Sequence, residues 1–189
     1  MLSIRAAVES DIPAMESLIA QSVATLQQHD YTEAQRAAAL GVIFGVDKAL
    51  VRDGTYLLAE VDGVIVACGA WSRRMNKFGS DNVPGKNDAL LDPATHPARI
   101  RSFFVHPAWA RKGIGSRILE ACEHAARSAG FTSLELVATV TGEYLYAVRG
   151  YTVTARYELD LAGGVKLPVI GMIRHLNPAT EVRLLTSPL

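Results

Sequence analysis

The sequence is poor in cysteine, with only Cys68 and Cys122 among its 189 residues. Cys68 lies in an apolar stretch and Cys122 on the apolar side of a predicted helix, so we expect both to be small reduced core residues. Neither has a second cysteine at metal-ligand spacing, and the five histidines form no motif with each other. The sequence therefore predicts no metal site, and reduced thiols make the cytoplasm the expected compartment.

An excess of charge of either sign is also missing. Nineteen Lys and Arg balance nineteen Asp and Glu, so the formal net charge is zero. There is no basic stripe interleaved with aromatic residues, so we expect no nucleic-acid partner. No apolar run is long enough to span a bilayer, and the first residues, MLSIRAAVESD, lack the apolar centre of a secretory signal. We therefore expect no membrane association.

Repeats, low-complexity tracts and signs of a domain boundary are absent as well. We predict one domain over residues 1–189, which is long enough for a substantial core. Strands are predicted at 2–6, 55–61, 64–71, 100–105, 133–138, 151–159 and 166–175, and the last of them ends before Pro178. Helices are predicted at 12–28, at 32–44, at 114–129 and at 141–148, with a short turn at 47–52.

The order of these elements predicts the fold class. A strand at 100–105, a helix and a strand at 133–138 form a crossover that places the two strands parallel in one sheet. Asp62-Gly63 is a favoured hairpin turn, which makes the strands on either side of it antiparallel. Pro168 and Gly171 indicate that the final strand is an edge strand or carries a bulge. We predict a mixed, mostly antiparallel sheet with helices, of α/β or α+β type.

Residues 75–97 are rich in Gly, Pro, Asn, Asp and Ser and have no periodic pattern. A loop of this length in a compact domain is usually functional or mobile. It is either a lid or substrate-specificity loop, or a solvated insertion without a role.

The junction between the strand at 100–105 and the following helix is the main functional clue. Its helix has apolar residues at helical spacing, and its polar residues, on the opposite side, are Arg117, Glu120, Glu123, His124 and Arg127. Arg111 and Lys112 precede Gly113 and Gly115, which lie at the predicted start of the helix. The first backbone N–H groups there have no partner within the helix, and the helix dipole adds partial positive charge. This combination fits a phosphate or pyrophosphate site, or a tight basic turn that simply needs glycine.

The run VHPAWARKGIGSRILEACEHAARSAGF resembles the acetyl-CoA-binding segment of the GCN5-related N-acetyltransferases, the GNAT superfamily. The run LELVATVTGEYLYAVRGYTV resembles the end of the same fold, and the element order agrees over nearly the whole chain. Val105-His106-Pro107 and Gly113-Ile114-Gly115 match the family pattern. The Arg or Gln of the strict pattern falls on Ala110, which moves the expected anion contacts from side chains to backbone amides.

This resemblance implies an acetyl-CoA site with a splayed central parallel strand pair. The strand backbone at Phe103, Phe104 and Val105 would pair with the pantetheine arm, and the thioester would lie in the gap between the two parallel strands. The pyrophosphate would be held by the loop and helix start, which comprise Arg111, Lys112, Gly113, Ile114, Gly115 and Ser116. The reaction implied is transfer of an acetyl group to a primary amine, with CoA as product and a small molecule as the expected acceptor.

The resemblance also implies catalytic residues. Leu145-Tyr146 followed by Gly150-Tyr151 matches the family pattern for a tyrosine that protonates the departing thiolate, so Tyr146 is the candidate general acid; the alternative is a packed aromatic residue. The base is Glu135, Glu143 or a water chain. The Asn that many members carry upstream of the tyrosine is replaced in the stretch 138–141.

Two other functions fit parts of the pattern. A non-catalytic acyl-CoA sensor or scaffold would keep the cofactor site without turnover. A Rossmann-type nucleotide-binding module would use Gly113 and Gly115, but Ile118 stands in place of the third glycine and the glycines come late after the strand. The N-terminal helices and the 75–97 loop are expected to wall the acceptor site, and a homodimer is left open.

Overall fold

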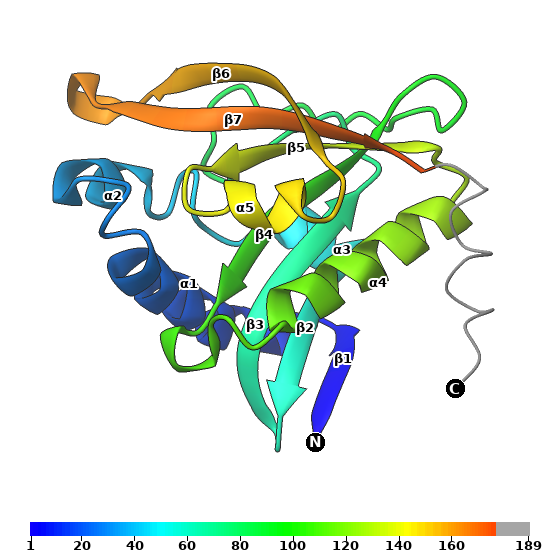
Figure 1. The fold of residues 1–189 in the computed structure, drawn as a ribbon, viewed down its shortest axis with the longest axis horizontal. Coiled ribbons are helices and arrows are strands. Elements are labelled where there is room, and N and C mark those ends of the chain that lie inside the picture. The colour runs from blue at the N-terminus through cyan, green and yellow to red at the C-terminus, as the bar shows by residue number, and fades with distance from the viewer. Residues whose placement is uncertain (177–189) are drawn as a thin grey trace.

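The computed structural model describes residues 1–176, which form a seven-stranded sheet with helices on both faces (Figure 1). The strand order is β1-β2-β3-β4-β5-β7-β6. The strands are β1 (Leu2–Ala6), β2 (Tyr56–Val61), β3 (Val64–Ser72), β4 (Ala98–Val105), β5 (Ser133–Thr139), β6 (Thr152–Asp160) and β7 (Lys166–His175). Only β4 and β5 pair in parallel, while the other neighbours are antiparallel. The predicted mixed, mostly antiparallel sheet is confirmed.

The sheet separates two apolar clusters, and helices cover each of them. The helices are α1 (Ile12–Leu26), α2 (Glu33–Ala39), α3 (Lys48–Arg52), α4 (Ile114–Ser128) and α5 (Glu143–Ala147). The buried side of α4 packs on one face of the sheet together with α5, whereas α1, α2 and α3 cover the other face. Cys68 and Cys122 are buried free cysteines, one in each cluster. Each face of the sheet therefore has its own core.

The parallel pair opens into a gap after three residue pairs. Ala98, Arg99 and Ile100 of β4 face Leu134, Glu135 and Leu136 of β5, and no pairing between these strands continues beyond them. On its other edge β5 pairs with β7 along its whole length. The residues of β4 beyond Ile100 thus present one backbone edge that no strand within residues 1–176 covers.

A bulge in β4 lies at the start of this gap. On β3 the partners of Arg101 and Phe104 are two residues apart, Ala70 and Cys68, so β4 carries one extra residue. Ser102 adopts φ of +58° within the bulge, a conformation that few residues other than glycine adopt. Its carbonyl oxygen accepts a hydrogen bond of 3.4 Å from the buried Tyr56 hydroxyl. The sequence analysis did not predict this bulge.

Gly69 of β3 sets the distance between α4 and the sheet. A Cβ atom at this position would lie 2.8 Å from Ile118 of α4 and 2.8 Å from the Phe103 ring. No side chain fits there, so the helix can approach the sheet closely, and the start of α4 lies beside the gap.

Several predicted boundaries need correction. The second helix ends at Ala39, because Leu40 is already extended with ψ of 132° and Gly41 takes a positive φ. The turn expected at 47–52 is the short helix α3, whose N-cap Asp47 accepts a hydrogen bond from Ala49 N. The last strand is not an edge strand, since β7 lies between β5 and β6. The alternative, a bulge, is present at Gly171 in the ladder between β6 and β7, and the extra residue there is Thr154 of β6. The predicted end at Pro178 lies outside the described residues.

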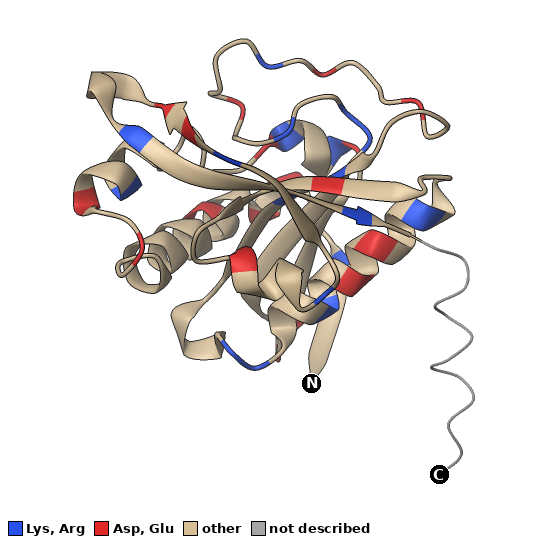
Figure 2. Ribbon diagram, turned by 45° about the horizontal axis from the view of Figure 1, so that its top comes forward, with Lys and Arg blue, Asp and Glu red and all other residues tan. Residues whose placement is uncertain are grey.

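Charged residues of both signs are interspersed over the ribbon (Figure 2), which agrees with the absence of a basic stripe in the sequence. Within residues 1–176 no helix has the length and apolarity needed to cross a membrane. In the same part of the chain, no group of three or more His, Cys, Asp or Glu side chains could hold a metal ion.

Candidate functional site

The uncovered edge of β4 leads directly to the start of α4. A short 3-10 turn, Pro107–Trp109, follows the strand, and the His106 ring accepts a hydrogen bond of 3.1 Å from Ala108 N. Arg111 and Gly113 both take positive φ values, +63° and +78°. These two residues turn the chain sharply, so that α4 begins at Ile114 with Gly113 as its N-cap.

The start of α4 has the features of an anion site. The first intrahelical bond runs from Arg117 N to Gly113 O at 3.1 Å, so the N–H groups at 114–116 have no acceptor earlier in the helix. A Cβ atom at Gly113 would meet nothing within 4 Å, which leaves the backbone open to a ligand. Arg111 and Lys112 are exposed, and Lys112 Nζ lies 4.7 Å from the centre of the Trp109 ring. The residues present therefore fit a pyrophosphate group.

The predicted pantetheine strand and the predicted pyrophosphate loop form one continuous surface. Phe103 and Val105 pack with the α4 cluster, whereas the Phe104 ring contacts Phe44 on the other face at a centroid distance of 6.1 Å. The two faces thus hold β4 in place from both sides. The resemblance assigns these segments to one site, and the structure places them side by side: a Cβ atom at Gly115 would lie 3.7 Å from the Val105 side chain.

Tyr146 of α5 lies against this surface. Its ring stacks edge-on to Phe103 at 6.1 Å and to Tyr151 at 5.7 Å, and the residue is 7% exposed. Within residues 1–176 its hydroxyl has no hydrogen-bond partner. Burial, with a smaller contribution from Cys122, raises the pKa of Tyr146. The phenol therefore keeps its proton at neutral pH, as a general acid must.

A buried polar network holds Tyr151, and through its ring Tyr146, in position. The Tyr151 hydroxyl donates to Glu123 Oε1 at 3.1 Å, and Arg174 forms an ion pair of 2.7 Å with the other oxygen of Glu123. Glu123 was placed on the exposed side of its helix from the sequence, and this is wrong, since it is only 5% exposed. Its spacing gives one signal, because Glu123 lies four residues after the buried Leu119.

The two candidate bases both have cationic partners. Glu135 lies on β5 opposite Arg99, with which it forms an ion pair, and it accepts a hydrogen bond of 2.5 Å from Lys77 Nζ. Glu143 of α5 is ion-paired to Arg156 at 2.5 Å, and its side chain is 29% exposed, against 23% for Glu135. Glu135 belongs to the second of the three pairs at the closed end of the gap, whereas Glu143 lies beyond its open end. The choice of base therefore stays a prediction.

Tyr31, which lies between α1 and α2, connects the N-terminal helices to the end of β5 and to β7. Its hydroxyl accepts from Val140 N at 2.9 Å and donates to Pro168 O at 2.7 Å. Asp30 accepts a hydrogen bond of 2.6 Å from the Thr141 hydroxyl beside it. The sequence analysis missed these residues, because their partners lie more than 100 positions away along the chain.

An opened parallel strand pair that leads to a helix start with free N–H groups and two adjacent cations suits a large anionic ligand. Residues 17–152 match the model of the acetyltransferase (GNAT) family. The match covers more than half of the chain, so the chain belongs to this family and is an acyltransferase. Members of this family use acetyl-CoA as the acyl donor. Among curated proteins no significant match is found.

Solved structures share the fold at low sequence identity. A GCN5-related N-acetyltransferase from Rhodopseudomonas palustris aligns with a TM-score of 0.69 and 20% identity, over 92% of this chain and 95% of that one. PaiA N-acetyltransferase from Thermoplasma acidophilum, in complex with coenzyme A, has a TM-score of 0.65 and 14% identity, over 93% and 99%. YncA from Salmonella typhimurium, with its cofactor acetyl-CoA, aligns with a TM-score of 0.62 and 20% identity, over 95% of this chain and 96% of that one.

Proposed function

We propose that this chain is an N-acetyltransferase that moves the acetyl group of acetyl-CoA to a primary amine of a small molecule. The observation that carries the proposal is the uncovered edge of β4, which is followed after one short turn by the basic start of α4. We further propose that residues 1–189 act as one domain. A cytoplasmic location and a homodimer remain predictions, and light scattering of the purified chain tests the second.

Acetyl-CoA supplies an activated acetyl thioester. In this proposal the backbone at Phe103, Phe104 and Val105 pairs with the pantetheine arm as an added strand. The pyrophosphate is bound by the N–H groups and cations of the α4 start, which are contributed by Arg111, Lys112, Gly113, Ile114, Gly115 and Ser116. This orientation places the donor sulfur near the free Tyr146 hydroxyl.

Tyr146 acts as the general acid in this scheme, because it is neutral and its hydroxyl makes no competing hydrogen bond within the described part of the chain. The acceptor amine must lose a proton before it attacks, and Glu135 receives that proton directly or through water. Glu143 is the second candidate, and its carboxylate is held in an ion pair by Arg156.

The first test concerns the cofactor site. By calorimetry the chain is expected to bind acetyl-CoA and CoA but not NAD, and Gly113→Ala is expected to weaken acetyl-CoA binding by about tenfold. The new Cβ would occupy the space the anion needs, at a φ of +78° that costs about 1–2 kcal/mol for an L residue.

Gly54→Ala is the matched control. Gly54 also has a positive φ, +70°, with nothing within 4 Å of its Cβ position, but it precedes β2 at the other end of the sheet. Both variants should lose similar stability, and only Gly113→Ala should lose acetyl-CoA affinity. Absence of binding to either CoA species by the unmodified chain would contradict the proposed function.

The base is tested by comparing two amide variants. Glu135→Gln is expected to lower kcat/KM for a primary amine by about 10²-fold, the usual contribution of a general base, and Glu143→Gln by less than about threefold. Release of free thiol from acetyl-CoA is the measurement. The reverse order of effects would assign the role to Glu143, and wild-type rates in both variants would assign it to a water chain.

The fold contradicts one of the two alternative functions and leaves the other to be tested. A Rossmann-type module is contradicted by the fold, since such a module has a mostly parallel sheet and only one strand pair is parallel here. A non-catalytic acyl-CoA sensor shares the cofactor site, and it would bind acetyl-CoA in calorimetry without releasing thiol in the presence of any amine.

A further inference from the structure

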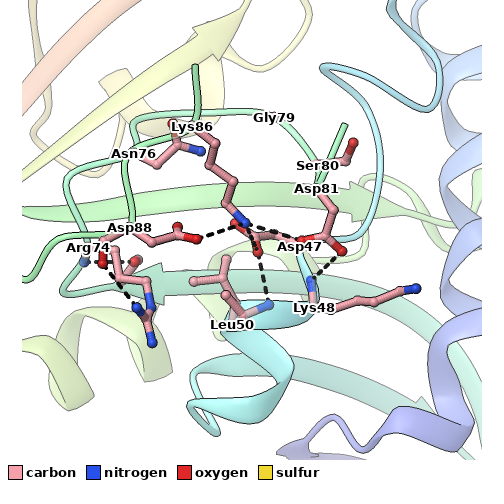
Figure 3. Close-up of polar contacts among 12 residues, drawn as sticks. Asp47, Lys48, Leu50, Arg74, Asn76, Gly79, Ser80, Asp81, Lys86 and Asp88 are labelled. Atoms are coloured by element: carbon pink, nitrogen blue, oxygen red, sulfur yellow. Dashed lines mark hydrogen bonds and ion pairs between the residues drawn. The ribbon is translucent and has the colours of Figure 1, made fainter. Parts of the chain in front are cut away.

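The 75–97 loop is fastened to the protein on both sides of Lys77. Before it, Arg74 binds both carboxylate oxygens of Asp53 at 2.6 and 2.7 Å. After it, the buried Arg101 donates to Gly79 O at 2.6 Å, and Lys86 binds the fully buried Asp47 at 2.7 Å (Figure 3). The loop is therefore a fixed wall of the face that carries Glu135, and Lys77 is held beside that carboxylate.

The two oxygens of Glu135 hold two different cations. Arg99 binds Oε2, and its side chain is only 6% exposed. Lys77 Nζ binds Oε1 at 2.5 Å, and its side chain is 47% exposed. A buried pair is costly to break, because it leaves a buried charge without a partner, whereas an exposed pair contributes only about 0.2–1 kcal/mol. Arg99 is thus a permanent partner of Glu135, and Lys77 is an exchangeable one.

The surroundings of Glu135 suit an ammonium group. Glu135 lies one pair away from Ile100 and Leu136, where the gap begins. A carboxylate oxygen accepts strong, charge-assisted hydrogen bonds from an alkylammonium ion.

We propose that Glu135 Oε1 binds the ammonium group of the acceptor, and that Lys77 occupies this position in the acceptor-free protein. The lysine Nζ is itself a primary alkylammonium with three N–H donors, so it has the same chemistry as the group it stands in for. The acceptor class is a primary alkylamine, which displaces Lys77 and leaves the Arg99 contact in place. This inference rests on the proposed function.

Kinetics with a primary alkylamine such as n-pentylamine provide the first test. Lys77→Met removes the internal competitor, so KM for the amine is expected to fall by about 1.4- to fivefold, which corresponds to the ~0.2–1 kcal/mol measured for exposed ion pairs. The value of kcat should stay within about twofold. Lys77→Arg keeps a cation on Glu135 and should retain the wild-type KM.

The control is Lys48→Met, which removes the same charge from the neighbouring α3, where the lysine side chain points away from the Asp47 cluster (Figure 3). Its KM should equal that of the wild type. A KM that is unchanged or raised in Lys77→Met would overturn the inference, since the lysine would then be only a structural tether. An acetyl group found on Lys77 by mass spectrometry would overturn it as well, because Lys77 would be a substrate.

A binding measurement separates this inference from the proposed function. Reductive ¹³C-methylation keeps the charge of the lysines, and the signal lost in Lys77→Met identifies Lys77. Addition of n-pentylammonium chloride is expected to move this signal toward that of a free lysine, whether or not turnover occurs. No shift, together with normal turnover, rejects the inference alone; a shift without thiol release rejects the proposed function alone.

Discussion

Replacing Tyr146 with phenylalanine is expected to lower kcat for acetyl transfer by about 10²- to 10⁴-fold, the range found for a general acid. The ring keeps its edge-on contacts with Phe103 and Tyr151, because the substitution removes only the hydroxyl. That hydroxyl makes no hydrogen bond within residues 1–176, so the free energy of unfolding should change little. Thiol release under saturating acetyl-CoA measures the effect.

Tyr144→Phe is the matched control, since Tyr144 lies on the same short helix but is 69% exposed. It should turn over as the wild type does. The pH dependence adds a second readout: because burial raises the pKa of Tyr146, loss of its proton should not limit the wild-type enzyme below about pH 10, the ordinary value for tyrosine. Unchanged turnover of Tyr146→Phe at every pH would assign the residue to packing alone.

Replacing Asp47 with alanine should have the largest effect on stability, with a loss of about 3–5 kcal/mol in the free energy of unfolding. Asp47 is fully buried and forms ion pairs with Arg101 at 3.0 Å and with Lys86 at 2.7 Å. The Arg101 side chain is itself fully buried, so the substitution leaves a charge without a partner inside the protein. Urea denaturation followed by circular dichroism measures the loss.

Asp81→Ala and Asp88→Ala are controls for this prediction. Both residues also pair with Lys86, at 3.2 and 3.6 Å, but they are partly exposed and lie at the loop surface (Figure 3). Each should cost less than about 1 kcal/mol. If Asp47→Ala is no less stable than these two variants, the buried cluster does not hold the loop.

The contribution of the Asp47 ion pairs to stability should depend on pH. Burial alone would raise the pKa of Asp47, but the hydrogen bond from Lys86 and the charge of Arg101 hold it below its usual value. A carboxyl group with a lowered pKa contributes stability above its unfolded value of about 3.9, and this contribution is lost as the pH falls through the folded value. The wild type should therefore lose stability below about pH 4 more steeply than Asp47→Ala does.

Local patterns predicted the elements of this fold well. The strand predicted at 166–175 has the observed bounds of β7, and Asp62-Gly63 placed the hairpin between β2 and β3. The crossover from β4 through α4 predicted the parallel pair. These features depend on neighbouring residues, which a single sequence displays directly.

Features that depend on distant partners were not predictable in the same way. Glu123 is buried because Arg174 and Tyr151 come from elements beyond β5, and nothing near Glu123 in the sequence indicates that pair. The ion pair between Asp47 and Arg101 was not predictable either, because the two residues lie 54 positions apart in the sequence. The position of Glu135 beside Lys77 likewise required the path of the 75–97 loop, which has no periodic pattern.

The bulge at Ser102 changes which face of the sheet the side chains of β4 point to. In a regular strand, side chains three positions apart point to opposite faces. Here Arg101 and Phe104 are paired with Ala70 and Cys68, which lie two apart and on the same face of β3. The inserted residue therefore shifts the alternation by one step, and the backbone amides turn with the side chains. The part of β4 before the bulge pairs with β5, and the part after it pairs with β3 alone.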